Sequence, residues 1–170
     1  MKQCLLYIWL FTGCAIVNFS AAAATQSVTA NMSFETSLVL TKNADIQFGL
    51  LQAGTPGTYK LDTTGAVTTS NGGVVVGGAS NAGQMTIGGS TTQAITVSTG
   101  GYVASNGVTL SSATCKYNGS TITNCDTGAA GLAAPGAGKE LKLGVTATVS
   151  GTQSVGSVAT PSFTVTVIYG

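Results

Sequence analysis

The feature that most constrains the fold is a long alternation of apolar and polar residues that begins near position 28. Its apolar members are Val28, Ala30, Met32, Phe34, Leu38 and Leu40, separated by Thr29, Asn31, Ser33, Glu35 and Ser37. A period of two predicts a β-strand with one dry face. As one strand the segment would run about 43 Å, whereas strands in small domains usually cover about 17–20 Å. We therefore expect its C-terminal part to open its own sheet and the part before it to pair with the exposed edge of another molecule.

The residues before this alternation have the pattern of a secretory signal peptide. Lys2 is the positive start, an apolar stretch spans residues 5–17, and small residues span 20–24. This pattern predicts a signal peptide over residues 1–24, with export through the periplasm to the cell surface or extracellular space. Cleavage after Ala22, Ala23 or Ala24 would each satisfy the small-residue requirement, and Ala24 is preferred because it leaves a polar N-terminus. Lipidation at Cys14 is the weaker alternative, because a phenylalanine stands where the lipoprotein-processing site usually has a smaller aliphatic residue.

The exported part of the chain, residues 25–170, carries almost no net charge. It holds five lysines and five acidic residues, and the chain has neither arginine nor histidine. Nucleic-acid binding needs clustered cations for phosphates and usually arginine for base edges, so this class of function is excluded. An uncharged surface also lacks the charges that keep strand edges from pairing indiscriminately. Such a protein either pairs its edges with a chosen partner or buries them.

Two cysteines, Cys115 and Cys125, remain after the signal is removed. In an oxidising compartment they are expected to form a disulfide. The Asn118-Gly119 pair between them indicates a tight turn, but a two-residue turn would place Cys115 opposite Ile122 rather than Cys125. We therefore expect a wider or bulged loop that the disulfide pins at its base.

The rest of the chain alternates short β-like stretches with glycine-rich turns, and no stretch has a convincing helical period. The high threonine and valine content favours strands, and the glycine content disfavours helices. We therefore predict an all-β fold, an Ig-like antiparallel β-sandwich in a single domain of residues 25–170, which a donor strand could complete. Residues 127–138 are expected to form a flexible surface loop. The stretches are Ile46 with Phe48, Tyr59 with Leu61, Val74 to Val76, Met85 with Ile87, Ile95 with Val97, Val108 with Leu110, Leu141 to Val149, and Phe163 to Tyr169.

Residue types that carry catalytic chemistry are scarce. Without histidine there is no ordinary serine or cysteine triad, and bridged cysteines are unavailable as nucleophiles. The five acidic residues match no paired-carboxylate motif, and neither a histidine cluster nor a calcium loop is present. Tyr59, Tyr102, Tyr117 and Tyr169 could line a sugar site, but packing at strand ends is the preferred interpretation. We expect no enzyme, no catalytic or metal-binding residue and no cofactor.

Several stretches of the chain resemble a known family. The segment from Leu38 to Gly49 (LVLTKNADIQFG), then Ala53-Gly54 and Gly57-Thr58, resembles the opening of a secreted bacterial family known as domain of unknown function 4402. The late stretch LKLGV at 141–145 and the terminal stretch FTVTVIY at 163–169 strengthen the match. The resemblance covers most of residues 25–170, and its motifs are structural rather than catalytic.

The stretch from Asp45 to Gly49 is also similar to subunits of archaic chaperone-usher pili and of the spore-coat U type. In those subunits an Ig-like domain lacks one strand until the N-terminal extension of a neighbour fills the gap. In this chain the first alternation would supply that extension, with a donor-strand interface formed by Val28, Ala30, Met32 and Phe34. The resemblance also implies a C-terminal strand that pairs with a periplasmic chaperone through Phe163, Val165, Val167 and Tyr169, and delivery to an outer-membrane usher.

Three functional hypotheses follow from these observations. The first is a non-catalytic structural subunit of a bacterial surface fibre, whose partners are further copies or neighbouring fibre subunits and which polymerises by N-terminal donor-strand exchange. The second is a self-complemented secreted or lipid-anchored surface domain whose loops bind a glycan or a protein partner. The third, an enzyme, has the least support. The length of the first alternation separates the first two, unless the segment bends near residues 35–37 and curls across both sheets of its own sandwich.

Overall fold

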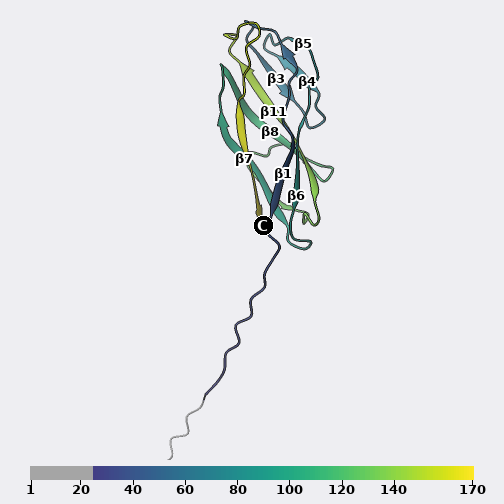
Figure 1. Ribbon diagram of the computed structural model, residues 1–170, viewed down its shortest axis with the longest axis vertical. Helices are drawn as coiled ribbons and strands as arrows, with labels where there is room; N and C mark the ends of the chain where they lie inside the picture. The colour runs from purple at the N-terminus through teal and green to yellow at the C-terminus, as the bar shows by residue number, and fades with distance from the viewer. Residues whose placement is uncertain (1–24) are drawn as a thin grey trace, which may run out of the picture. The chain divides into compact units, whose positions relative to one another are not determined.

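A computed structural model describes residues 25–170, and the regular secondary structure of this part consists of β-strands (Figure 1). The predicted signal peptide and Cys14 lie outside the described residues. No helix among the described residues is long and apolar enough to cross a membrane. The strands are β1 Val39–Ala44, β2 Leu50–Leu51, β3 Gly57–Leu61, β4 Val67–Ser70, β5 Val75–Gly77, β6 Gly83–Gly88, β7 Ile95–Val103, β8 Val108–Tyr117, β9 Ser120–Ile122, β10 Ala129–Leu132, β11 Lys139–Val149 and β12 Ser162–Tyr169.

The chain divides into residues 1–33 and 34–170, and the second unit holds every strand that the structure describes. Of the first unit, residues 25–33 are described: they are exposed and belong to no strand. The second unit has a seven-stranded and a three-stranded antiparallel sheet, with β2 and β5 as a small separate pair. This arrangement confirms the predicted all-β antiparallel sandwich.

Strand β11 is the centre of the larger sheet. Its long alternation of apolar residues forms the predicted strand, and β8 pairs along one of its edges from Leu141 to Val149. The other edge is shared: β6 pairs with residues 139–143 and β3 with residues 145–149. Gly144 lies at the junction, where a Cβ atom would stand 2.8 Å from the carbonyl carbon of Asp62 and closer still to the carbonyl oxygen of Leu61. Only a residue without a side chain lets the backbone after β3 pass so close to β11 at the point where the pairing partner of β11 changes from β6 to β3.

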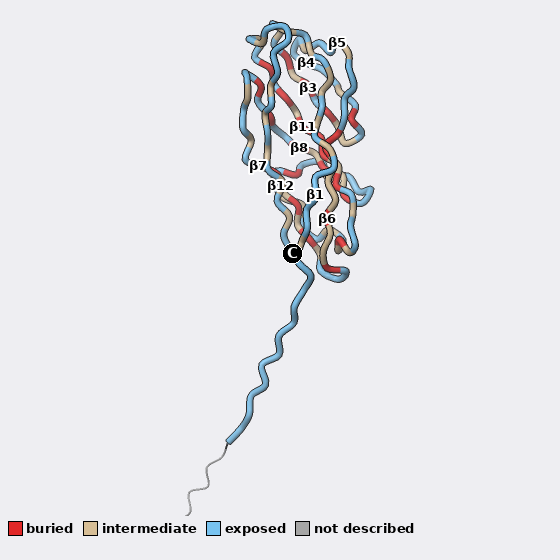
Figure 2. Tube along the Cα trace, viewed as in Figure 1, coloured by how far each residue is buried: buried red, intermediate tan, exposed pale blue. Residues whose placement is uncertain are grey.

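The smaller sheet has the order β10-β7-β12 and packs its inner face against the larger one. Buried residues follow the strands of residues 34–170, as Figure 2 shows. The core contains fully buried aliphatic and aromatic residues, among them Tyr59, Ile87, Ile95, Leu141 and Val145. Burial of Tyr59 and Tyr117 agrees with packing rather than with a sugar site for these two tyrosines.

Strand β1 departs in part from the expected dry face of Leu38 and Leu40. Leu38 is half-buried against the core, but Leu40 is 40% exposed. The reason lies in the sheet sizes: β1 is the edge strand of a seven-stranded sheet, and three strands are too few to cover all of it. The expectation that the C-terminal part of the first alternation opens its own sheet is confirmed, because β1 pairs with β6.

The predicted disulfide between Cys115 and Cys125 is present, with its Cα atoms 6.0 Å apart. The expectation that it would widen the turn at Asn118-Gly119 is wrong. Strands β8 and β9 form a regular hairpin in which Cys115 lies opposite Ile122, and the two turn residues have φ angles of 46° and 85°. Positive φ angles at both central residues are typical of a type I′ turn.

The disulfide and the regular hairpin coexist because the chain reverses again after β9. The amide of Cys125 donates to the carbonyl of Ala113 in β8 at 3.0 Å, and its carbonyl accepts from the amide of Thr99 in β7 at 3.0 Å. The buried Cys125 thus lies between the two sheets and links them. A prediction that considered only the hairpin register could not include this second reversal.

Asp126 fastens the same segment to β7. Its carboxylate accepts hydrogen bonds from the hydroxyl of Thr99 at 2.6 Å and from the hydroxyl of Tyr102, which in turn accepts from the amide of Ala113 at 3.1 Å. Burial raises the pKa of Tyr102, and the hydrogen bond to Asp126 raises it further. Residues 127–138, expected as a flexible loop, instead contain β10, which pairs with β7, and the buried Pro135. The alanine and glycine residues of β10 have low strand propensity, so the sequence did not predict this strand, which forms through backbone pairing with β7.

Candidate functional site

Strand β12 has one paired and one unpaired edge. It pairs with β7 from Ser162 opposite Val103 to Tyr169 opposite Ile95. Its other edge has no backbone partner among residues 25–170. Phe163, Val165, Val167 and Tyr169, predicted as the chaperone-pairing residues, are half-buried and pack against the core. An unpaired edge beside apolar side chains is a template for an added strand.

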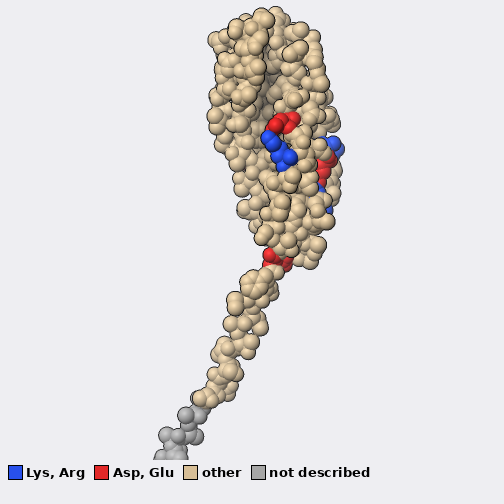
Figure 3. All heavy atoms as spheres, viewed as in Figure 1, with Lys and Arg blue, Asp and Glu red and all other residues tan. Residues whose placement is uncertain are grey.

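A large apolar groove opens beside this edge and appears as a deep furrow in Figure 3. Its volume is about 1350 Å³, and one lip is formed by residues 44–53 and the other by residues 153–163 with Val165. The floor consists of side chains from β6, β8 and β11, namely Met85, Val108, Leu110, Leu143, Ala147 and Val149. Small-molecule pockets usually have about 300–1,000 Å³, so the groove has room for a larger occupant.

Backbone pairing holds the lip formed by residues 44–53. Gln47 exchanges two backbone hydrogen bonds with Asn81, at 2.9 and 2.8 Å, and the amide of Gln52 donates to the carbonyl of Val74 at 3.0 Å. The lip is thereby fixed to the segment of residues 74–81, and the free backbone edge beside the groove is that of β12.

Hydrogen bonds link segments at and near the groove. The amide of Gly54 donates to the carbonyl of Gln153 at 2.9 Å, which joins the two lips. Outside the groove, the hydroxyl of Tyr169 accepts from the amide of Ser90 at 2.8 Å and donates to the carbonyl of Thr36, so the end of β12 is fastened to the segment before β1.

Charge is nearly absent from the groove. Its charged lining residues are Lys42 and Asp45, whose side chains pair with each other at 2.8 Å. Within residues 25–170 no group of three or more histidine, cysteine, aspartate or glutamate side chains could hold a metal ion. The groove thus offers apolar contact and strand pairing to its occupant, and little electrostatic attraction.

The segment predicted to act as donor is fully accessible. Val28, Met32 and Phe34 are 95%, 76% and 89% exposed, and Ala30 is exposed as well. The segment keeps a period of two without a sheet partner, which is unusual for large apolar side chains in a monomeric protein. Its role as donor remains a prediction.

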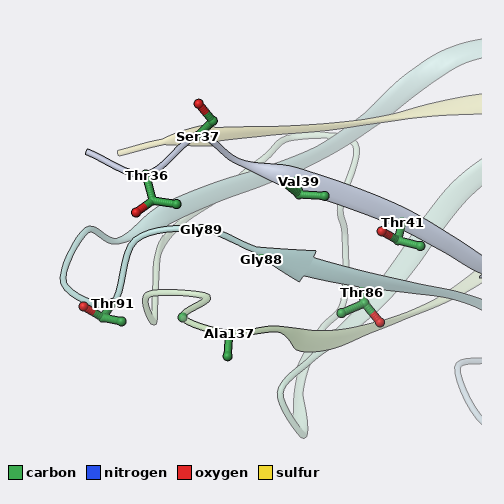
Figure 4. A pocket seen from close by; sticks show the side chains of 10 residues that line it. Thr36, Ser37, Val39, Thr41, Thr86, Gly88, Gly89, Thr91 and Ala137 are labelled. Carbon is green, nitrogen blue, oxygen red and sulfur yellow. The ribbon is translucent and has the colours of Figure 1, made fainter. Parts of the chain in front are cut away.

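A second, shallower depression of about 570 Å³ lies over β1 and β6 (Figure 4). It is lined by Thr36, Ser37, Val39, Thr41, Thr86, Gly88, Gly89, Thr91, Gly136 and Ala137. These side chains provide hydroxyl groups but no titratable group. The depression therefore has no means of acid, base or nucleophilic activation of its own.

The sequence analysis missed both lips of the groove. Residues 44–53 combine an isolated bridge with the two-residue strand β2, and residues 153–161 contain no strand. The weak signals were Ile46 with Phe48 on the first lip, and two valines, Val155 and Val158, in an otherwise small and polar loop on the second. Neither pattern indicates a groove until the topology places the two segments side by side.

Comparison with known proteins adds one finding. No curated protein and no solved structure matches the chain. A family model described as Domain of unknown function (DUF4402) matches residues 38–169, which span every strand from β1 to β12. The chain therefore belongs to the family described as Domain of unknown function (DUF4402).

Proposed function

We propose that this protein is a non-catalytic structural subunit of a bacterial surface fibre, in which the N-terminal segment of one copy fills the groove of the next. The observation that carries the proposal is the combination of an unpaired β12 edge, an apolar groove beside it, and an exposed segment with a period of two. Each feature is a liability in a monomer. Together they complement one another between copies.

The dimensions of the two parts agree. The eight residues of β12 extend about 26 Å, and the seven residues from Val28 to Phe34 extend about 23 Å. A strand added beside β12 continues the smaller sheet and directs every second side chain toward the floor of the groove. Val28, Ala30, Met32 and Phe34 would then cover the apolar floor, while Thr29, Asn31 and Ser33 would face solvent.

Growth into a fibre follows from the geometry of such a contact. The donor segment and the groove are different surfaces, so that each copy donates to one neighbour and accepts from another. A head-to-tail contact of this kind gives a filament unless the ring closes. Strand pairing along seven residues, combined with burial of large apolar side chains, supports a durable assembly.

An open groove needs protection before assembly. The free edge of β12 and the uncharged surface offer no barrier to pairing with wrong partners. A periplasmic chaperone that covers β12, and an outer-membrane usher that exchanges it for the next subunit, are the partners this proposal calls for. Residues Phe163, Val165, Val167 and Tyr169 are the proposed contacts with the chaperone.

The test compares the exported full-length protein, recovered from the periplasm with its disulfide intact, with a variant that lacks residues 25–35. Size-exclusion chromatography with light scattering measures the mass of each. We expect SDS-resistant ladders from the full-length protein and a folded monomer from the deletion variant, because residues 25–35 belong to no strand. Thr29→Ala with Ser33→Ala is the matched control and is expected to polymerise.

The opposite result would support the second hypothesis. A full-length protein that stays monomeric, together with a deletion variant that unfolds, would mean that the N-terminal segment completes its own sandwich. Fibres from the deletion variant would exclude residues 25–35 as the donor. Turnover of a polysaccharide or peptide by the purified protein would support the enzyme hypothesis instead.

A further inference from the structure

Four exposed aliphatic residues line the groove: Leu50, Val76, Val155 and Val158. Their exposures are 64%, 67%, 92% and 77%, so they lie at the rim rather than on the floor. We call them the rim residues. A donor strand directs its apolar side chains inward and its polar side chains outward, so it leaves these exposed side chains without an apolar partner.

We propose that Val155 and Val158 pack against the body of the next subunit beside the point where its donor segment leaves, where Val39 of β1 and Ile168 of β12 are exposed. This inference rests on the proposed function, since it concerns the contact that donor insertion imposes. Val39 and Ile168 are 57% and 54% exposed. The fibre is then a stiff rod of abutting domains rather than a string of independent ones.

The length of chain between donor and body requires this contact. The body begins at Thr36, whose carbonyl accepts a hydrogen bond from Tyr169, and Leu38 is already half-buried in its own core. Phe34 is the last predicted donor residue, and two residues of chain span at most about 7 Å. When Phe34 lies in the groove of a neighbour, the two bodies therefore touch.

The direction of insertion determines which surfaces meet. The pairs within the smaller sheet are antiparallel, and an antiparallel donor places Phe34 near Ser162, beside the loop that carries Val155 and Val158. The opposite direction would place the next body at Tyr169, where Thr36 of the acceptor itself lies. Steric exclusion at that end and exposed valines at the other both favour the antiparallel direction.

The surface on the incoming body lies close to its donor segment. Val39 is three residues after Thr36, and Ile168 is next to Tyr169, whose hydroxyl bonds to Thr36. The two residues therefore lie close to the point at which the donor segment leaves the body, Val39 on one sheet and Ile168 on the other. Aliphatic residues on both surfaces, without charge among the four, give a small apolar contact of the kind that stiffens an assembly.

The test uses the mature chain with Val155→Ser and Val158→Ser, and Val75→Ser is the control, because Val75 is 40% exposed but does not line the groove. Fibre stiffness is measured by electron microscopy, and subunit release is measured in denaturant. The double variant is expected to bend more and to release subunits about tenfold faster, which corresponds to loss of apolar contact worth about 1.4 kcal/mol. The control is expected to match the wild type.

A peptide of residues 25–35 separates the rim contact from the groove. It is titrated into the mature chain carrying Met32→Asp, a substitution that prevents this chain from acting as donor itself. The titration is repeated with Val155→Ser and Val158→Ser added, which we call the rim substitutions. We expect both proteins to bind the peptide within about twofold of each other, since the peptide has no body. Failure of the peptide to bind would overturn the proposed function and this contact with it.

A second variant inserts six glycine and serine residues between Glu35 and Thr36, so that the bodies can separate. Its fibres are expected to be flexible, and adding the rim substitutions should change them no further. The contact would be overturned, and donor insertion left intact, by the following pair of results. The peptide binds, and fibres of the Val155→Ser, Val158→Ser variant are as stiff as wild-type fibres and release subunits as slowly.

Discussion

The sharpest prediction concerns the period of the donor segment, tested as single substitutions in a peptide of residues 25–37. Phe34 is 89% exposed before binding, so insertion removes nearly its whole side chain from water. Burial of such a side chain is worth about 1.5–3 kcal/mol, and Phe34→Ser should therefore weaken binding about tenfold to a hundredfold. Val28→Ser and Met32→Ser should have similar effects, since these residues are 95% and 76% exposed.

The outward residues provide the matched controls. Thr29→Ala, Asn31→Ala and Ser33→Ala should each change the dissociation constant less than about twofold, because their side chains stay in water. Fluorescence anisotropy of a labelled peptide, titrated with the mature chain carrying Met32→Asp, measures every constant. Equal losses at odd and even positions, or losses that recur every three to four residues, would refute strand insertion.

Three further predictions concern the scaffold that holds the groove. Gly144→Ala should lower stability by about 1–3 kcal/mol, since its new Cβ atom would collide with the backbone at Leu61; thermal unfolding measures the loss. Cys125→Ser should cost about 3 kcal/mol by freeing Cys115, and a reductant should then destabilise only the wild type. Hydrogen bonds from the hydroxyl of Thr64 and from the backbone of Thr64, Ala66 and Gly65 hold the pKa of Asp62 below its usual value. The stabilisation by Asp62 is therefore present above about pH 4 and is lost as the pH falls through the folded-state pKa. Asp62→Ala should remove this contribution to the pH dependence of the free energy of unfolding. Denaturant titrations between about pH 5 and about pH 2 would detect the change.

The alternating strands are the part of the fold that the sequence predicts well. Along β11 the residues from Leu141 to Val149 alternate with the period of the pleat, and burial of one face follows from that pattern. Strand β12 obeys the same rule. The disulfide was predictable because residues 25–170 contain two cysteines. These features depend on local spacing, which a sequence displays directly.

The remaining features depend on what the topology places beside each residue. β10 is made of alanine, glycine and leucine, so its identity as a strand comes from pairing with β7 rather than from its own propensity. Leu40 continues the apolar phase of the first alternation, yet it is 40% exposed because the smaller sheet does not cover β1. The period of a strand indicates which residues lie on the same face of a sheet. Whether that face is buried depends on whether the opposite sheet covers it.

On the proposed donor insertion, the groove would show how a protein with few charges can select its partner. Charged side chains usually protect strand edges, and β12 has none on its free edge. The groove offers an apolar floor beside that edge, with Lys42 and Asp45 as its charged lining residues. A strand with apolar side chains at every second position would cover this floor, whereas a helical segment presents the wrong period. The period of the donor would then provide the specificity that charge provides on other sheet edges.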